Sequence, residues 1–333
     1  MSRQRMVVLG RLVDEAVERC QLRLAGRRVV TEAATGAYAA TALLAARAGA
    51  DVTALARGTH HGSVPEVHRW LLDTAELLGV AERIDVVEDL TCTHLSSADI
   101  VTNSGHLRPL DDRLIRSLQP TAVVPLMMEA WEVGAGRSDV DLAALRRWGI
   151  AHAGTNERHP AVGVFEYLGL MAVKLLLDSG VPVVGTHLLL LCDNPFGPYL
   201  ERTLTACGAQ LTVASSPASA VRTARPVDAV VVSLTPATGP RLGARELECL
   251  AEVAPGAVLA QFFGDIDRVA ATARGFTCWP DPAPPHGHMG VLPSAIGDEP
   301  IVRLQAGGLK VGEVLLKAEA ARTPFESGFL DVL

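Results

Sequence analysis

Short runs of apolar and β-branched residues alternate along the chain with longer segments that have apolar positions at helical spacing. Residues 28–33 (RVVTEA) predict a buried strand, and an Ala-rich helix follows that ends near Gly49. Residues 66–78 place apolar side chains on one helical face, and Asp111 is expected to cap a further helix. The other strands predicted in the first half are 51–55, 84–87, 98–101 and 122–126.

The second half repeats this alternation. A long helix is predicted over residues 161–179, and a last helix over residues 309–321. Strands are predicted at 187–192, 210–214, 228–234, 257–261 and 276–279. Alternating strands and helices of these lengths predict an α/β fold with two Rossmann-like domains and parallel, doubly wound sheets. We expect the domains at residues 1–155 and 156–305, with residues 306–333 forming a C-terminal helix that packs back on the first domain.

Composition excludes several classes of protein. The 333 residues include 30 Lys and Arg against 37 Asp and Glu, so a net charge of −7 disfavours a nucleic-acid partner. A hydrophobic content of 49% excludes a disordered chain. No apolar run is long enough to span a membrane and no secretory segment is evident, so we expect no membrane partner and a cytoplasmic location.

Several segments are similar to one enzyme family. Residues 139–156 (DVDLAALRRWGIAHAGTN), 228–236 (DAVVVSLTP) and 254–261 (APGAVLAQ) resemble motifs of the D-isomer-specific 2-hydroxyacid dehydrogenases. The resemblance extends over about two thirds of the chain, from Ala98 to Gly297. It implies a tandem Rossmann scaffold, NAD or NADP as cofactor, a homodimer, and a small-molecule substrate bound in the cleft between the domains.

The chain departs from that family at its chemical motifs. The sequence CDNPFG (192–197) stands where the dinucleotide fingerprint GxGxxG belongs, so the resemblance assigns cofactor contacts to Asp193, Asn194, Phe196 and Gly197. The following strand ends in Ser215-Ser216 and offers no carboxylate for an adenosine ribose. The catalytic Arg, Glu and His of the family correspond to stretches that lack the Arg and the His. The resemblance therefore implies the scaffold with a rebuilt site.

The first domain also resembles the opening of a class I methyltransferase. Residues 29–87 give strand, turn, helix and strand, followed by LGVAERIDVVED, a pattern that implies S-adenosylmethionine. The turn contains Gly36, and the second strand is followed by Arg57, where an adenosyl ribose needs an acid. An Arg at that place suits the 2′-phosphate of NADP, so Gly36 and Arg57 are further cofactor candidates; Arg57 as a solvated loop residue is the alternative.

Polar clusters at predicted strand ends supply candidates for chemistry. In the first, Ser104, Gly105 and His106 follow a strand and are expected to hold a substrate carboxylate; an ordinary turn is the alternative. The second holds two carboxylates and an indole, which suit an acid/base pair or a bound amine against a stacking wall; surface acids beside a core Trp are the alternative. Its residues are Glu129, Trp131 and Glu132.

Two further clusters contain histidine. Asn156, Glu157 and His159 precede the long helix, where they are expected to bind substrate or, for His159, to act as acid/base; a capping turn is the alternative. His288, next to His286 in a Pro-rich loop, is expected to replace the missing family histidine, and we expect no metal. Arg303 and Lys310 are candidates for an anion clamp or for surface salt bridges.

The sequence thus predicts a small-molecule enzyme, foremost an NAD- or NADP-dependent oxidoreductase acting on a small carboxylated or amino-bearing substrate. A non-redox lyase, isomerase or transferase on the same scaffold is the first alternative. A methyltransferase and a non-catalytic ligand-binding protein follow.

Overall fold

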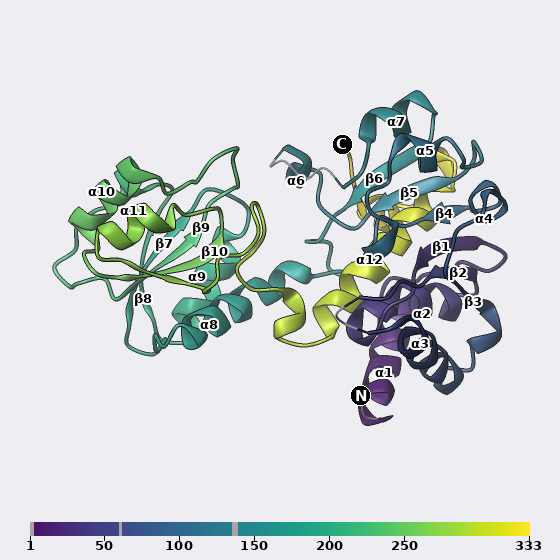
Figure 1. The fold of residues 1–333 in the computed structure, drawn as a ribbon, viewed down its shortest axis with the longest axis horizontal. Helices are drawn as coiled ribbons and strands as arrows, with labels where there is room; N and C mark the ends of the chain where they lie inside the picture. The colour runs from purple at the N-terminus through teal and green to yellow at the C-terminus, as the bar shows by residue number, and fades with distance from the viewer. Residues whose placement is uncertain (1–2, 60–61, 135–138) are drawn as a thin grey trace. The chain divides into compact units, whose positions relative to one another are not determined.

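The computed structural model describes residues 3–59, 62–134 and 139–333, which form two compact units (Figure 1). The first unit contains residues 3–133, 139–164 and Asp298–Leu333, and the second contains Phe165–Gly297. We expected divisions after residues 155 and 305, whereas the structure divides the chain after residues 164 and 297. The second boundary differs because the C-terminal helix begins at Glu299 and belongs to the first unit over its whole length.

The first unit is built on a seven-stranded sheet in the order β12-β6-β5-β4-β1-β2-β3. All neighbours pair in parallel except β12, which runs antiparallel to β6. Without β12 this is the Rossmann order 3-2-1-4-5-6, whose direction of winding reverses between β1 and β4. The strands are β1 Arg28–Glu32, β2 Asp51–Leu55, β3 Ile84–Val87, β4 Ile100–Val101, β5 Val123–Leu126, β6 Ala151–Thr155 and β12 Leu330–Asp331.

Helices cover both faces of this sheet, because successive strand residues point to opposite sides. Val29 packs in a core cluster with α1, α2 and α12, whereas Val30 packs in a second cluster with α5 and α7. Helix α12 contacts β5, β6, α1 and α2. The helices of this unit are α1 Arg3–Arg19, α2 Ala40–Arg47, α3 Val64–Leu77, α4 Cys92–Ser96, α5 Asp112–Ile115, α6 Trp131–Gly134, α7 Leu142–Arg147, α12 Glu299–Leu315 and α13 Pro324–Ser327.

The second unit has a parallel five-stranded sheet in the order β11-β10-β9-β7-β8, with its own core of Leu and Val side chains. The winding reverses between β7 and β9, and such a reversal is where sheets of this kind form their ligand crevice. The strands are β7 His187–Cys192, β8 Gln210–Ala214, β9 Ala229–Ser233, β10 Val258–Phe263 and β11 Thr277–Trp279. The helices are α8 Leu168–Asp178, α9 Gly197–Ala206, α10 Ala244–Val253 and α11 Arg268–Ala273.

The α/β class and the two Rossmann-like parallel sheets are confirmed. The sequence reasoning missed α1, β6 and β12. It also began the long helix too early, since 164–167 form a 3₁₀ turn before α8, and it began the last helix ten residues too late. In the described part of the chain, no helix combines the length and apolarity that crossing a bilayer demands.

Candidate active site at the carboxyl edge of the seven-stranded sheet

The carboxyl ends of β1, β2, β4, β5 and β6 bring together residues that are far apart in sequence. Three of the four predicted polar clusters follow β4, β5 and β6, and the small-residue turn of Gly36 follows β1. Parallel strands end at the same edge of their sheet, and this edge is where open α/β sheets bind ligands. The fourth predicted cluster, which holds His286 and His288, lies in the second unit.

Glu32, the last residue of β1, is an acid buried at this edge with 5% of its surface exposed. Its carboxylate occupies the space that a side chain at position 105 would take, since a Cβ on Gly105 would lie 1.3 Å from Glu32 Oε2. Burial raises the pKa of Glu32 to about 7, against the opposing effects of Arg108 and the backbone N–H of His106. Near neutral pH, Glu32 can therefore both give and accept a proton.

Polar side chains surround the point where the winding reverses between β1 and β4. The hydroxyls of Thr31, Thr102 and Ser104 hydrogen bond to one another at 2.7–3.2 Å. Asn103 Oδ1 accepts a hydrogen bond from the backbone N–H of Met127 at 2.8 Å, which fixes the orientation of the amide. Asn103 Nδ2 is buried and has no partner among the described residues, and such a donor costs about 1–3 kcal/mol unless an acceptor reaches it. An acceptor atom placed beside Asn103 Nδ2 would satisfy this donor.

Two arginines act electrostatically on this edge of the sheet, Arg108 on Glu32 and both Arg57 and Arg108 on His106. In the β1–β2 pairing Glu32 stands opposite Leu55, so Arg57 follows two residues beyond that pair. The Arg57 side chain is exposed and has no hydrogen-bond or ion-pair partner within the described ranges. Burial, followed by the charges of Arg57 and Arg108, lowers the pKa of His106. This shift favours the neutral form of His106. Arg57 and Arg108, of which Arg108 is paired with Asp139 at 3.1 Å, favour an anionic ligand at this edge.

Glu129, which follows β5, is 1% exposed and already has partners. Trp131 Nε1 donates to its Oε2 at 2.7 Å, and Arg158 Nε donates to its Oε1 at 3.1 Å. Burial raises the pKa of Glu129, and these two donors oppose that shift. The Glu132 carboxylate accepts the backbone N–H of Glu129 at 2.9 Å. The Glu129 carboxylate thus accepts from Trp131 and Arg158, whereas the Glu132 carboxylate accepts from the backbone of Glu129.

Asn156 and His159, which follow β6, hold the C-terminal segment. Asn156 Nδ2 donates to the carbonyl of Gly328 at 2.9 Å, and the His159 ring stacks on Phe329 with centroids 3.9 Å apart. His159 Nδ1 accepts the backbone N–H of Ala161, and burial lowers the pKa of the ring. Both side chains thus contact the C-terminal segment, and His159 also contacts the turn before the long helix. The neighbouring Glu157 contributes its backbone carbonyl to the same turn.

The two basic residues expected as an anion clamp are engaged on α12. Lys310 is buried against Glu313 at 2.8 Å, and Arg303 pairs with Glu299 at 2.5 Å. Lys310 also contacts Gln21, which precedes β1, so its ammonium lies toward the opposite edge of the sheet from Glu32. The expected clamp is therefore not formed from these two side chains, because each has an acidic neighbour on its own helix.

The loop after β7 does not have the features that hold a dinucleotide. Asp193 accepts hydrogen bonds from Thr235 N and Oγ1 at 2.7 and 3.0 Å and pairs with Arg241 at 2.8 Å. Asn194 donates to the carbonyl of Ser233 and accepts the backbone N–H of Phe196, which is itself buried. A diphosphate in the usual pose needs glycine backbone and free N–H groups here. In this loop the Asp193 carboxylate is held by Thr235 and Arg241, and the Phe196 N–H already donates to Asn194. The loop therefore does not fit a diphosphate in that pose.

The histidine loop of the second unit is exposed. His286 Nδ1 lies 2.7 Å from Asp265 Oδ2, and His288 Nδ1 contacts the carbonyl of His286 at 3.0 Å. Over the described ranges, no three His, Cys, Asp or Glu side chains gather in an arrangement able to hold a metal ion.

Sequence reasoning missed Glu32 and Asn103. The sequence predicts Glu32 as part of a buried strand, and an acid within the run RVVTEA is the signal that points to it. Asn103 directly precedes the three residues predicted as the first cluster, and sequence alone does not reveal that its Nδ2 is buried without a partner among the described residues.

No family model matches the chain, and no curated protein matches it in sequence. Among solved structures, it is similar to a dipicolinate synthase subunit from Bacillus halodurans, with 11% identity and a TM-score of 0.54 over 89% of this chain and 100% of that one. The corresponding dipicolinate synthase polypeptide from Bacillus subtilis is similar at 12% identity and a TM-score of 0.54, covering 91% and 100%. An NAD-dependent formate dehydrogenase from Staphylococcus aureus, solved with NAD, matches at 15% identity and a TM-score of 0.48, covering 86% and 94%. The similarity to the two Bacillus structures shows a shared two-unit fold.

Proposed function

We propose that this chain is an enzyme acting on a small carboxylated molecule, with Glu32 as the group that transfers a proton. One observation carries the proposal: a buried carboxyl with a pKa of about 7 stands at the winding reversal of the sheet. A general acid or base works best when its pKa lies near the working pH, and such perturbed groups concentrate at active sites.

The neighbours of Glu32 supply the remaining requirements for proton transfer. Asn103 Nδ2, which has no partner among the described residues, is placed to donate a hydrogen bond to a carbonyl oxygen of the substrate and so polarise that carbonyl. The exposed Arg57 guanidinium is suited to a carboxylate. Glu32 would then remove a proton from the carbon beside that carbonyl, which leaves an enolate, and would return the proton to another atom of the substrate. The positive charge of Arg57 favours a carboxylated substrate. An amino-bearing substrate is disfavoured because Glu129, which could bind an amine, already has Arg158 as its counter-ion.

For the reaction class, we infer a non-redox lyase, isomerase or transferase. The loop at residues 192–197 supports this inference, because its own side chains use the groups that would otherwise contact a diphosphate. No step in the proposed proton transfer requires a dinucleotide.

A titration of Glu32 tests the proposal before any substrate is known. We expect the ¹³C carboxyl signal that is missing from Glu32→Gln to titrate near pH 7 in the native protein. A Glu32 pKa below about 5, close to that of a solvated Glu, would remove the basis for the proposal. The native protein should also exchange α-hydrogens of some 2-oxo acids for deuterium in D₂O. Glu32→Gln should abolish this exchange, whereas the exposed-residue control Glu82→Gln should retain it.

An NADP-dependent oxidoreductase is the second candidate, with the cofactor in the first unit. The turn after β1 supports it, since Ala33, Ala34 and Gly36 offer small side chains and Gly36 has a φ of +64°. Arg57 after β2 is suited to a 2′-phosphate. NADPH at about one hundred times its Kd would stabilise the protein by roughly 2.7 kcal/mol. This candidate would be favoured by a rise in melting temperature with NADPH that neither NADH nor S-adenosylmethionine produces. The rise should be lost in Arg57→Ala and kept in Arg83→Ala. Absence of any shift in folded protein would exclude it.

A further inference from the structure

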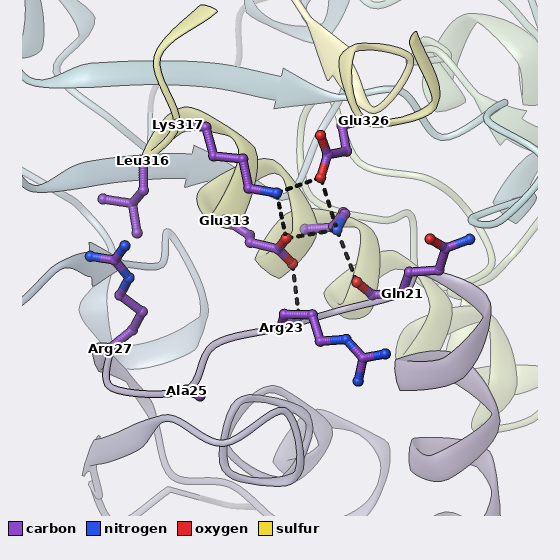
Figure 2. A pocket seen from close by; sticks show the side chains of 9 residues that line it. Gln21, Arg23, Ala25, Arg27, Glu313, Leu316, Lys317 and Glu326 are labelled. Carbon is purple, nitrogen blue, oxygen red and sulfur yellow. Dashed lines mark hydrogen bonds and ion pairs between the residues drawn. The ribbon is translucent and has the colours of Figure 1, made fainter. Parts of the chain in front are cut away.

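A cavity of about 360 Å³ lies in the first unit, at the amino edge of the sheet rather than at the Glu32 edge (Figure 2). Its walls come from the segment before β1, the C-terminal part of α12 with the residues that follow, and α13. The lining residues are Gln21, Arg23, Ala25, Arg27, Lys310, Glu313, Leu316, Lys317 and Glu326.

A buried ammonium forms part of this wall. Lys310, 2% exposed, donates to the carbonyl of Gln21 at 3.0 Å and to Glu313 Oε1 at 2.8 Å. Glu326 Oε1 is 3.9 Å from Nζ, beyond hydrogen-bond distance. An ammonium carries three donors, so Lys310 keeps one N–H without an acceptor in the part of the chain described.

Both acids of the cavity are already neutralised. Glu313 Oε1 contacts Lys310 and Lys317, and its Oε2 accepts the backbone N–H of Arg23 at 2.8 Å. Glu326 accepts from Lys317 at 2.5 Å, and this bond, with the N–H of Thr323, lowers the pKa of Glu326 to about 2. Figure 2 shows both carboxylates turned toward the lysine ammonium groups.

The lining as a whole carries excess positive charge. Arg23, Arg27, Lys310 and Lys317 stand against Glu313 and Glu326, a net charge of +2 at neutral pH. Arg27 is shared with Asp99, which lies 3.9 Å away, outside the lining. The exposed Arg23 guanidinium has no ion-pair or side-chain hydrogen-bond partner among the residues described, and its planar donors match the oxygens of a phosphate.

We propose that this cavity binds a small phosphorylated molecule, with Arg23 and Lys317 contacting the phosphate at the mouth and Lys310 providing the buried charge. A cavity of about 360 Å³ has room for a small phosphorylated molecule such as glycerol 3-phosphate. The site is separate from Glu32, and its occupant need not be the substrate of the proposed reaction.

Calorimetric titration of the whole chain with glycerol 3-phosphate, inorganic phosphate and succinate tests the proposal. Calorimetry measures binding directly, whereas phosphate also raises melting temperatures by being excluded from protein surfaces. We expect millimolar or tighter binding of glycerol 3-phosphate, weakened about tenfold in Arg23→Ala and unchanged in Arg28→Ala, an exposed arginine outside the lining. Arg23 is used because removing Lys310 would leave Glu313 buried without its counter-ion.

Three results would overturn the proposal. They are the absence of heat with either phosphate compound in folded protein, equal affinity in Arg23→Ala and Arg28→Ala, and Arg23-dependent binding of succinate without binding of phosphate. Binding of inorganic phosphate as tightly as glycerol 3-phosphate would support the site and show that the phosphate group alone is recognised.

Discussion

The Glu32 carboxyl at the end of β1 is buried in space that Gly105 leaves free. Gly105 has a φ of +42° and leaves the space that the Glu32 carboxylate fills. The resulting burial makes the charged form of Glu32 costly, and its stability contribution therefore depends on pH. An apolar side chain would avoid this cost, as Val29 and Val30 do in the same strand and Leu55 does opposite Glu32. A buried carboxyl in this position is what the proposed proton transfer requires.

The pH dependence of stability follows from the sign of this shift. Because the pKa of Glu32 rises from 4.5 to about 7 on folding, the folded state holds its proton more tightly. Its contribution is fully present below pH 4.5 and is lost as the pH rises through 7, a change of about 3 kcal/mol. Urea unfolding at about pH 5 and pH 8 should therefore show a larger loss in native protein than in Glu32→Gln. Equal losses in the two proteins would contradict the raised pKa.

Helix α12 approaches the sheet closely because three of its residues have no side chain. A Cβ on Gly307 would lie 2.7 Å from Val162, one on Gly308 2.7 Å from Met127, and one on Gly312 3.1 Å from Ile100. Glycine within a helix costs about 1 kcal/mol relative to alanine, so these residues are explained by the packing they permit.

We therefore expect Gly308→Ala to destabilise the protein by about 1–3 kcal/mol, the range for overpacked cores, despite its gain in helix propensity. Gly10→Ala on α1 is the matched control, because its Cβ would meet Leu78 at an ordinary 3.4 Å. That substitution should leave stability unchanged or raise it by up to about 1 kcal/mol. Chemical denaturation of the two variants measures the change in the free energy of unfolding that each substitution causes. Stabilisation by Gly308→Ala would show that α12 does not pack as described.

The elements that sequence could predict were those with strong local signals. The β-branched run before Glu32 and the glycine-ended helices were predicted correctly, whereas the two-residue strand β12 gains its definition only from pairing with β6. The polar clusters after β4, β5 and β6 were found because they follow strands. Their roles depended on contacts over long sequence separations, and no local pattern predicts that Phe329 covers His159.

At the scale of the whole molecule, the two units differ in how the chain builds them. Apart from Gly134, the described part of the second unit is one segment, Phe165–Gly297, which holds its core and its sheet. The first unit is discontinuous, and its C-terminal part supplies both α12, which contacts β5, β6, α1 and α2, and the edge strand β12. The first unit therefore cannot complete its core until the last residues of the chain are present.

Separate expression of the pieces tests this difference. The segment 165–297 should fold alone and unfold cooperatively, since it lacks no strand of its sheet. Residues 1–164 should remain unfolded or molten alone, because the core faces that α12 covers would be exposed to water. Adding residues 298–333 in trans should restore cooperative unfolding and amide protection to β5 and β6. Cooperative folding of residues 1–164 without that peptide would show that α12 is dispensable to the first unit.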